Sequence, residues 1–204
     1  MSDDIERVPV TCIAVGLDLS LSSTGFVLKA GTRMNMETVK TVPKNFDNDL
    51  ERLKHISAEL MQRIPNDVTM VCVEDFFTPG NNQQIGAAIK LAMLGTVVRL
   101  ALYDRGIPFY TVAPSQIKKF CTGKGTCPKS IIIREVYKRY GVDCKDDNQA
   151  DALVLANIAR VIACMLDPDT TLVTDGEIPK FQLKVAQKII DERPNYNVRE
   201  KVDG

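Results

Sequence analysis

The sequence predicts a single α/β domain in which a mixed five-stranded sheet is flanked by helices. Three short β-rich segments follow one another near the start of the chain, separated only by turns, which is typical of an antiparallel meander. Apolar strand-like runs then alternate with helical patterns, which is typical of parallel strands joined by helices. The 204 residues, 45% of them hydrophobic, are enough to bury one sizeable core.

The antiparallel part of the sheet is expected in the first 42 residues. The run TCIAVGLDLS is short and apolar up to Asp18, so we interpret it as a buried strand. A turn that contains serine and glycine leads to a second strand, GFVLKA. A turn at Gly31 then leads to a third strand, which ends near Val42.

The parallel part of the sheet is expected to consist of strands connected by helices. Asp47 or Asn48 can cap the first helix, which has apolar residues at helical spacing. The run VTMVCVEDFF is apolar until Glu74 and predicts a central strand covered on both faces. A long helix at about 83–104 is rich in alanine and glycine, which permit close approach to a neighbour, and a short strand follows at 107–112.

Helices are expected to dominate the rest of the chain. They begin near Pro114, Pro128, Ala150 and Lys180. The third of these, ADALVLANIARVIACML, is strongly apolar and is therefore expected to be buried. We divide the chain into a polar leader at 1–11, a folded domain at 12–166, and a linker, C-terminal helix and loose tail at 167–204.

Charge and cysteine usage narrow the class of protein. The formal net charge is zero, but residues 115–140 carry seven basic side chains and one acid, a footprint of a polyanion site or of a solvated helix face. The six cysteines form no CxxC pair and His55 is the only histidine, which argues against structural zinc. No stretch approaches a membrane span and no apolar signal segment is present, so we expect a cytoplasmic protein without membrane contact.

Acidic residues end two of the apolar strands. Asp18 closes the first strand and Glu74 closes the run that we expect to be central. Exposure at the edge of the sheet would explain either acid alone. If the two strands are neighbours, however, the carboxylates lie close enough to repel each other. A divalent cation removes that penalty, so the pair indicates a metal site.

A further group of acids begins the apolar helix. Asp147 and Asp151 are four residues apart, and Asn148 and Asp151 are three apart, so these side chains share a helix face. Asp151 lies inside the apolar run, where an unpaired charge is costly. Asp146 is explained by its favourable position at a helix N-terminus. The predicted catalytic acids are therefore Asp18, Glu74, Asp147 and Asp151.

Carboxylate oxygens suit Mg²⁺, and they predict a metal-dependent nuclease. Mg²⁺ takes hard oxygen ligands and keeps several of its waters. Two such ions about 3.5–4 Å apart can assist an in-line displacement at phosphorus. The sequence offers no Ser–His or Cys–His pair that could act as a nucleophile beside these acids. Its single histidine, His55, lies in a predicted helix with no acidic motif around it.

Five segments in order resemble the RuvC family of Holliday junction resolvases, within the ribonuclease H-like superfamily. They are GLDLSLSSTGF, VEDFF, NNQQIGAAIKLAMLGTVV, VAPSQIKKFCTGKGTCPKSIIIREV and NQADALVLA, and they span roughly residues 12–166. The resemblance implies a ribonuclease H-like fold and two Mg²⁺ ions per active site, with Mn²⁺ as a substitute. It also implies a homodimer that cuts branched DNA at four-way junctions and leaves 5′-phosphate and 3′-hydroxyl ends. The helix at 83–104 is our candidate for the dimer interface.

The resemblance also assigns roles to individual residues. It makes Asp18, Glu74 and Asp151 metal ligands. It places Phe77 where the family has an aromatic side chain that stacks on a base, although a core phenylalanine would fit as well. Lys118 and Lys129 fall where the family has basic residues near the scissile phosphate. The predicted DNA-binding residues are Phe77, Lys118, Lys119, Lys124 and Lys129.

One position departs from the family pattern. Asn148 stands where the family commonly has Asp or His, three residues before its final Asp. Either Asn148 ligates through its carbonyl oxygen or Asp147 replaces it, and we favour Asp147. The C-terminal extension has no counterpart in the family, and together with the divergent sequence it fits a phage or viral relative that acts in the host cytoplasm.

Two other functions stay open. An actin-like ATPase or sugar kinase also places an Asp and a glycine-containing turn after its first strand, but 204 residues are too few for two such lobes. A non-catalytic protein that binds DNA junctions is the other alternative. The intact Asp18, Glu74 and Asp151 argue against it, whereas Asn148 keeps it open.

Overall fold

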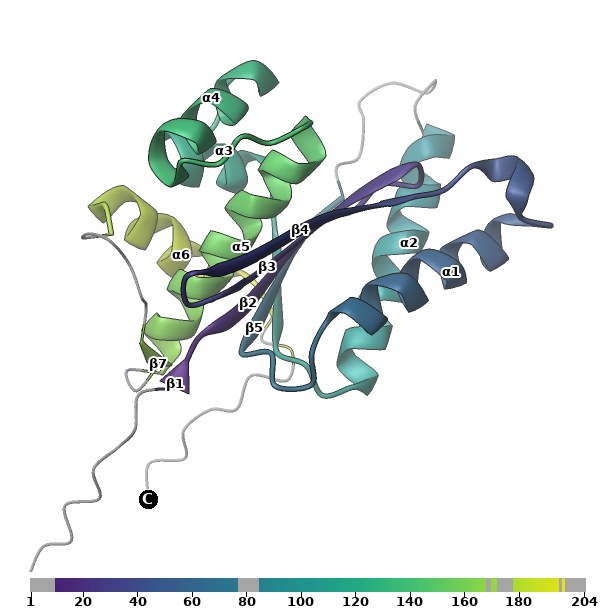
Figure 1. Ribbon diagram of the computed structural model, residues 1–204, viewed down its shortest axis with the longest axis horizontal. Helices are drawn as coiled ribbons and strands as arrows, with labels where there is room; N and C mark the ends of the chain where they lie inside the picture. Colours follow the sequence, from purple (N-terminus) through teal and green to yellow (C-terminus); the bar gives the residue numbers. More distant parts are fainter. Residues whose placement is uncertain (1–9, 77–84, 168–169, 172–177, 195, 197–204) are drawn as a thin grey trace, which may run out of the picture.

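The fold is a five-stranded mixed sheet with helices on both faces, as a computed structural model shows (Figure 1). The structure describes residues 10–76, 85–167, 170–171, 178–194 and 196. The sheet strands are β2 (Ile13–Asp18), β3 (Ser23–Ala30), β4 (Arg33–Lys40), β5 (Met70–Glu74) and β6 (Phe109–Val112). Their order across the sheet is β4-β3-β2-β5-β6.

The pairing of the strands confirms the predicted combination of a meander and parallel strands. β2, β3 and β4 pair antiparallel, whereas β5 pairs parallel with both β2 and β6. β5 is therefore a central strand, as its continuous apolar run predicts. The second strand begins earlier than expected, at Ser23, because the expected turn residues already pair with β4.

Helices connect and cover the sheet at positions close to those predicted. They are α1 (Asp49–Arg63), α2 (Ile85–Asp104), α3 (Pro114–Thr122), α4 (Lys129–Tyr140), α5 (Asp147–Leu166) and α6 (Lys180–Glu192), with a short 3-10 helix η1 (Pro43–Asn45) before α1. Of the two expected caps of α1, Asn48 is the residue used, since its side chain accepts a hydrogen bond from the Glu51 N–H at 3.0 Å.

α5 begins three residues earlier than the apolar pattern indicates. Asp146 is its N-cap, and its carboxylate accepts a hydrogen bond from the Gln149 N–H at 2.9 Å. This confirms the capping explanation for Asp146. Asp147 and Asn148 are consequently in the first turn of the helix and not in a loop before it.

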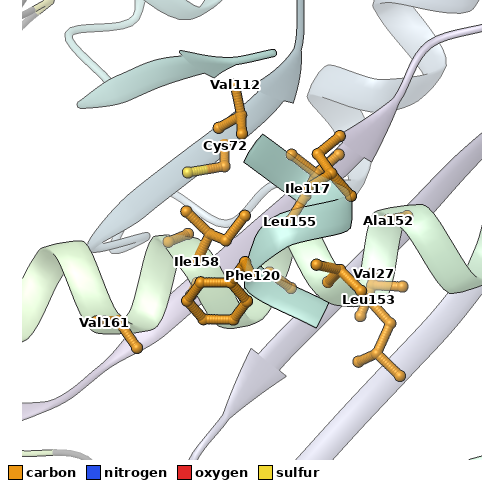
Figure 2. Close-up of a cluster of buried hydrophobic side chains, with 14 of the residues drawn as sticks. Val27, Cys72, Val112, Ile117, Phe120, Ala152, Leu153, Leu155, Ile158 and Val161 are labelled. Atoms are coloured by element: carbon orange, nitrogen blue, oxygen red, sulfur yellow. The ribbon is translucent and has the colours of Figure 1, made fainter. Parts of the chain in front are cut away.

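The face of the sheet under α5 contains the larger part of the core (Figure 2). Cys72 of β5 and Val112 of β6 pack there with Leu155 and Ile158 of α5, and α3 adds Phe120. The helix backbone lies directly on the strands at two glycines. A side chain at Gly16 would overlap the Ala152 carbonyl oxygen, and one at Gly25 would overlap the Asn148 carbonyl oxygen.

The opposite face of the sheet is covered by α1 and α2 (Figure 1). Val15 and Leu17 of β2 pack there against buried residues of both helices. Our expectation that no segment has the length of a membrane span was wrong. By length and composition alone, α2 and α5 are both long and apolar enough to cross a membrane. α5 passes that test as a largely buried core helix, whereas α2 leaves much of its apolar surface outside the core.

The two terminal regions contact each other and the core. β1 (Val10–Thr11), which we placed in the leader, pairs parallel with β7 (Thr170–Thr171), which we placed in the linker. α6 packs beside α3 and α5, with Val185, Ala186 and Ile189 buried in the core. Beyond α6 the tail was expected to be loose, but Tyr196 stacks on Phe109 with ring centroids 4.7 Å apart.

Candidate active site

Asp18 and Glu74 end two adjacent strands on the same face of the sheet. In the parallel pairing of β2 with β5, Leu17 lies opposite Val73, so Asp18 and Glu74 follow as the next neighbours. Adjacent strands lie about 4.8 Å apart. Side chains alternate along a strand, and Gly16 faces α5, so both carboxylates project from the face that α5 covers. Asp18 is only 6% exposed.

The start of α5 lies over this pair. Gly25 is the cross-strand partner of Asp18, and its α-carbon lies against the Asn148 carbonyl. Asp147 and Asn148 are half-buried in the first turn, and Asp151 is one turn further along. The Oδ1 atom of Asp151 is shielded from solvent. The structure therefore brings all five predicted ligands to one edge of the sheet, from three separate elements.

The donor chemistry of this edge fits a hard cation, but the described side chains do not enclose one. Carboxylate oxygens are the ligands that Mg²⁺ takes. Among the residues that the structure describes, no three His, Cys, Asp or Glu side chains lie close enough together to hold a metal ion. Asp147 and Asn148 are both half-buried in the first turn of α5. The ligand set stays a prediction.

Cys121 of α3 lies near the acids but is unsuited to act as a nucleophile. Burial raises the pKa of its thiol to about 12, opposed by the charge of Arg139 and reinforced by Glu135, Cys127 and Asp151. A thiol with so high a pKa stays protonated at neutral pH. Its interaction with Asp151 also indicates that the C-terminal part of α3 lies beside the start of α5.

Asp75 is a part of this region that sequence reasoning missed. Its carboxylate lies 2.7 Å from the Arg193 Nη1 atom and 3.9 Å from the Arg99 Nη1 atom. A small pocket lies beside it, lined by Leu19, Glu74, Asp75, Phe76, Leu91, Gly95 and Arg99. No sequence signal links Asp75 to Arg193, because 118 residues separate them. The predicted base-stacking residue Phe77 lies outside the described residues.

The predicted DNA-binding lysines lie on the α3–α4 hairpin, which begins beside Glu74. Val112 pairs with Glu74 at the end of β6, and α3 starts two residues later. Lys118 is half-buried on α3, whereas Lys119 and Lys124 are exposed. Lys129 is the first residue of α4. The Thr122 hydroxyl orders the connecting turn by accepting from the Lys124 N–H at 3.1 Å and donating to the Lys118 carbonyl at 2.9 Å.

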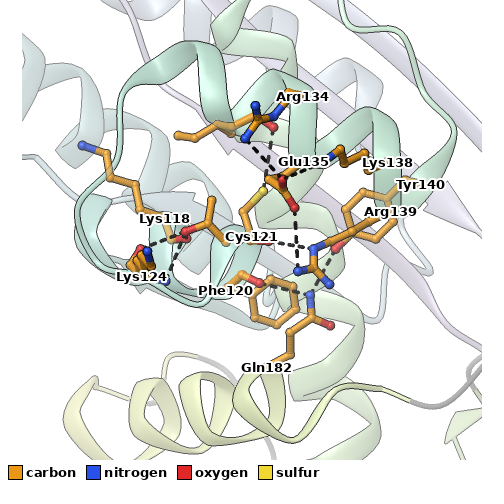
Figure 3. A network of polar contacts seen from close by, with 12 residues as sticks. Lys118, Phe120, Cys121, Lys124, Arg134, Glu135, Lys138, Arg139, Tyr140 and Gln182 are labelled. Atoms are coloured by element: carbon orange, nitrogen blue, oxygen red, sulfur yellow. Dashed lines mark hydrogen bonds and ion pairs between the residues drawn. The ribbon is translucent and has the colours of Figure 1, made fainter.

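The basic side chains of α4 surround a single acid (Figure 3). Glu135 lies 3.9 Å from Arg134, 3.6 Å from Lys138 and 4.0 Å from Arg139. Arg134 and Lys138 are about 60% exposed, and exposed ion pairs of this kind are weak. One carboxylate does not neutralise three cations, so the outer face of the hairpin stays positively charged.

Comparisons with known proteins agree with these features. A family model described as "Crossover junction endodeoxyribonuclease RuvC" matches residues 14–159. The chain is 30% identical over 156 residues to the crossover junction endodeoxyribonuclease RuvC of Paenarthrobacter aurescens (strain TC1), and the match covers 72% of this chain and 80% of that protein. The family match includes every predicted acid and ends before α6.

Two solved structures share the fold. They are Thermus thermophilus RuvC, with a TM-score of 0.58, and T. thermophilus RuvC in complex with Holliday junction substrate, with a TM-score of 0.56. Each is 24% identical to this protein, and each match covers 71% of this chain and 90% of that chain. The likeness confirms the expected ribonuclease H-like architecture of a mixed five-stranded sheet flanked by helices.

Proposed function

This chain belongs to the RuvC family of crossover junction endodeoxyribonucleases, and we propose that it is a structure-selective endonuclease that cleaves four-way DNA junctions. The observation that carries the proposal is the placement of Asp18 and Glu74 at neighbouring strand ends under the start of α5. A T. thermophilus relative has been solved with a Holliday junction substrate, and we extend that substrate to this chain. Nucleases of this family are metal-dependent in general.

The proposed reaction is hydrolysis of a phosphodiester that leaves 5′-phosphate and 3′-hydroxyl ends. Asp18, Glu74 and Asp151 would hold two Mg²⁺ ions, with Asp147 or Asn148 completing the set and Mn²⁺ able to substitute. Bound ions of this kind lower the pKa of a coordinated water and stabilise the leaving oxygen. The protein supplies the rigid frame, because β2, β5 and α5 fix where each carboxylate starts.

A divalent cation would relieve the repulsion between the acids at this edge. Like charges within a few ångströms oppose each other, and binding of a divalent ion reverses the sign of that interaction. We therefore expect Asp18, Glu74 and Asp151 to favour the binding of a divalent cation over a monovalent one.

The α3–α4 hairpin supplies the binding surface for DNA in this proposal. Exposed lysines such as Lys119 and Lys124 attract the phosphate backbone, and such contacts position DNA without reading its sequence. Because α3 starts beside Glu74, a strand held on the hairpin passes close to the acidic edge.

A homodimer would provide the two symmetric cuts that a four-way junction requires. α2 carries an exposed stripe, which we call the α2 stripe and which consists of Ile85, Ile89, Met93, Thr96, Leu100 and Tyr103. Ile89 and Tyr103 are each 55% exposed, and with Thr96 they repeat every seven residues along the helix. That repeat suits packing against a second helix. We propose that α2 of a second copy covers the α2 stripe.

Incubation with a labelled four-way junction tests the function. Cleavage should require Mg²⁺, stop with EDTA, be far weaker on a linear duplex of the same sequence, and be lost in Asp18→Asn. Tight binding without metal-dependent cleavage would contradict the enzyme and support the junction-binding alternative, which Asn148 keeps open. Turnover of ATP in the absence of DNA would support the ATPase alternative instead.

A further inference from the structure

We propose that Arg193 is a positioning residue, which holds the end of β5 through Asp75 and thereby sets the direction of the Glu74 carboxylate. The proposal rests on the assignment of Glu74 to the nuclease site. Arg193 follows α6 and lies outside the segment that matches the family model, residues 14–159. The match to the family model therefore assigns it no role.

Asp75 is held by groups from several segments. Its Oδ2 atom accepts a hydrogen bond from Arg193 Nη1 at 2.7 Å, and its Oδ1 atom accepts one from the Phe76 N–H at 3.1 Å. Oδ1 also lies 3.9 Å from Arg99 Nη1 on α2. The Asp75 and Arg193 side chains are only 19% and 26% exposed, so their ion pair is partly shielded from water and from salt.

The alternation of side chains along a strand transmits this constraint to Glu74. Glu74 projects toward α5, so Asp75, the next residue, projects toward α2, where Arg99 meets it. The Asp75 N–H also donates to the Val112 carbonyl at 2.8 Å, which extends the ladder with β6 by one residue. With both its side chain and its backbone held, Asp75 leaves Glu74 little freedom to rotate about the strand axis.

The C-terminal segment is anchored on both sides of Arg193. Before it, the Gln182 amide of α6 donates to the Phe120 carbonyl at 3.0 Å and lies 3.4 Å from the Tyr140 hydroxyl (Figure 3). After it, the Tyr196 carbonyl accepts from the Phe109 N–H at 3.2 Å, and the two rings stack. Arg193 is therefore placed by contacts to the α3–α4 hairpin and to β6, and not by its pair with Asp75 alone.

These contacts connect the two halves of the proposed active surface. α6 touches the hairpin that carries the basic residues, where the Arg139 guanidinium also lies 5.2 Å from the Phe181 ring centre. The residues directly after α6 reach the acidic edge. One segment thus fixes the distance between the phosphate-binding surface and Glu74, which matters because misplacing a reacting group by about 1 Å can cost a hundredfold in rate.

The test uses the full-length protein and three variants. Arg193→Gln removes the charge but keeps a polar side chain, and Arg193→Lys keeps the charge but loses the forked geometry. Lys188→Gln is the matched control, since it removes an exposed pair with Glu192 in the C-terminal part of α6. Amide hydrogen exchange at Asp75 and Phe76, the junction dissociation constant in EDTA and the single-turnover cleavage rate in Mg²⁺ are measured for each.

Arg193→Gln should raise amide hydrogen exchange at Asp75 and Phe76 about tenfold. In the wild type, local opening of the end of β5 must break the ion pair between Arg193 and Asp75, and in the variant it need not. Its cleavage rate on saturating junction should fall about tenfold, while junction binding changes less than about twofold. Exchange at Val15 in the core should not change, which separates positioning from general destabilisation. Arg193→Lys should recover part of both effects, and Lys188→Gln should match the wild type.

Two results would overturn the proposal. Unchanged exchange at Asp75 and Phe76 in Arg193→Gln shows that Arg193 does not hold the strand end, whether or not the protein cleaves DNA. Raised exchange with an unchanged cleavage rate shows that the tether does not position Glu74. A wild-type protein that cleaves no junction contradicts the proposed function instead, and the exchange experiment still decides whether Arg193 fixes this edge.

Discussion

α2 and α5 are each 20 residues long and similarly apolar, yet the fold uses them in opposite ways. α5 is buried along most of its length and lies in the centre of the core. α2 buries only Leu94, Gly95, Val98 and Leu102 and leaves the α2 stripe exposed. Length and hydropathy alone therefore do not determine which helix is buried in the core of the chain and which stays exposed for contact with a second chain.

The surfaces beneath the two helices account for the difference. α5 lies on two strands that carry glycine at the points of contact, Gly16 and Gly25, so its backbone approaches theirs closely. α2 contains the small residues that predicted such an approach, but Gly86 faces open space and Gly95 makes only ordinary contacts. The close approach occurs where the sheet, and not the helix, has the glycines.

The largest expected effect concerns the acid that α5 delivers to the sheet. Asp151→Asn should reduce junction cleavage about a thousandfold, because it removes a charge that the reaction uses, while junction binding is retained. Asp104→Asn, which changes an exposed acid at the end of α2, should cleave at the wild-type rate. Single-turnover rates measure both. An Asp151→Asn variant that cuts normally would remove α5 from the active site.

The next effect concerns packing against the sheet. Gly16→Ala should lower the free energy of unfolding by about 3 kcal/mol or more, because the new methyl group overlaps the backbone of α5 at Ala152. Gly86→Ala on α2 should instead raise it by up to about 1 kcal/mol, since a helical position with open space gains only the helix propensity of alanine. Urea denaturation compares the two. Equal effects would contradict the contrast between the helices.

A smaller effect is expected for the exposed face of α2. The double variant Ile89→Glu and Leu100→Glu should weaken the dimer about a hundredfold without unfolding the monomer, because both side chains are 55% exposed. Sedimentation over a range of concentrations measures the association. Leu50→Glu on α1, at a position that is 66% exposed, is the control and should leave association unchanged. Persistence of the dimer in the double variant would place the interface elsewhere.

The last expected effect, which appears only at alkaline pH, is a pH dependence at the distal part of α5. Lys29 donates to Asn157 of α5 at 3.0 Å, and its burial, together with the charge of Arg160, lowers the pKa of its ammonium to about 8 from 10.5. Between these two pH values the unfolded chain binds more protons than the folded chain, so the free energy of unfolding should rise from pH 8 to 10.5. Below pH 8 the buried charge of Lys29 should lower that free energy by a constant amount.

Lys29→Gln tests this dependence through the difference in unfolding free energy from the wild type. That difference should change between pH 8 and 10.5 and be flat between pH 6 and 7.5. Lys90→Gln, which changes an exposed lysine on α2 paired with Asp49, is the control. A flat difference for Lys29→Gln over the whole range would show that Lys29 is not strained by its burial.

The sequence predicted most elements because their signals are local. The cap at Asn48 and the apolar period of α1 act within a few residues, and the structure has both of them. The start of α5 was missed by three residues, since a capping residue followed by polar helical residues resembles a loop. The apolar strand ends likewise pointed to Asp18 and Glu74 before their register was known.

The chain by itself determined the type of fold, its acidic residues and the family to which it belongs, because each is recorded in the order and spacing of residues. Only the tertiary structure decided that β2 and β5 are neighbours, so that Asp18 and Glu74 lie at adjacent strand ends, and that Asp75 meets Arg193. Such outcomes depend on distances between residues far apart in the chain. No local pattern specifies those distances, since they arise from how whole elements pack.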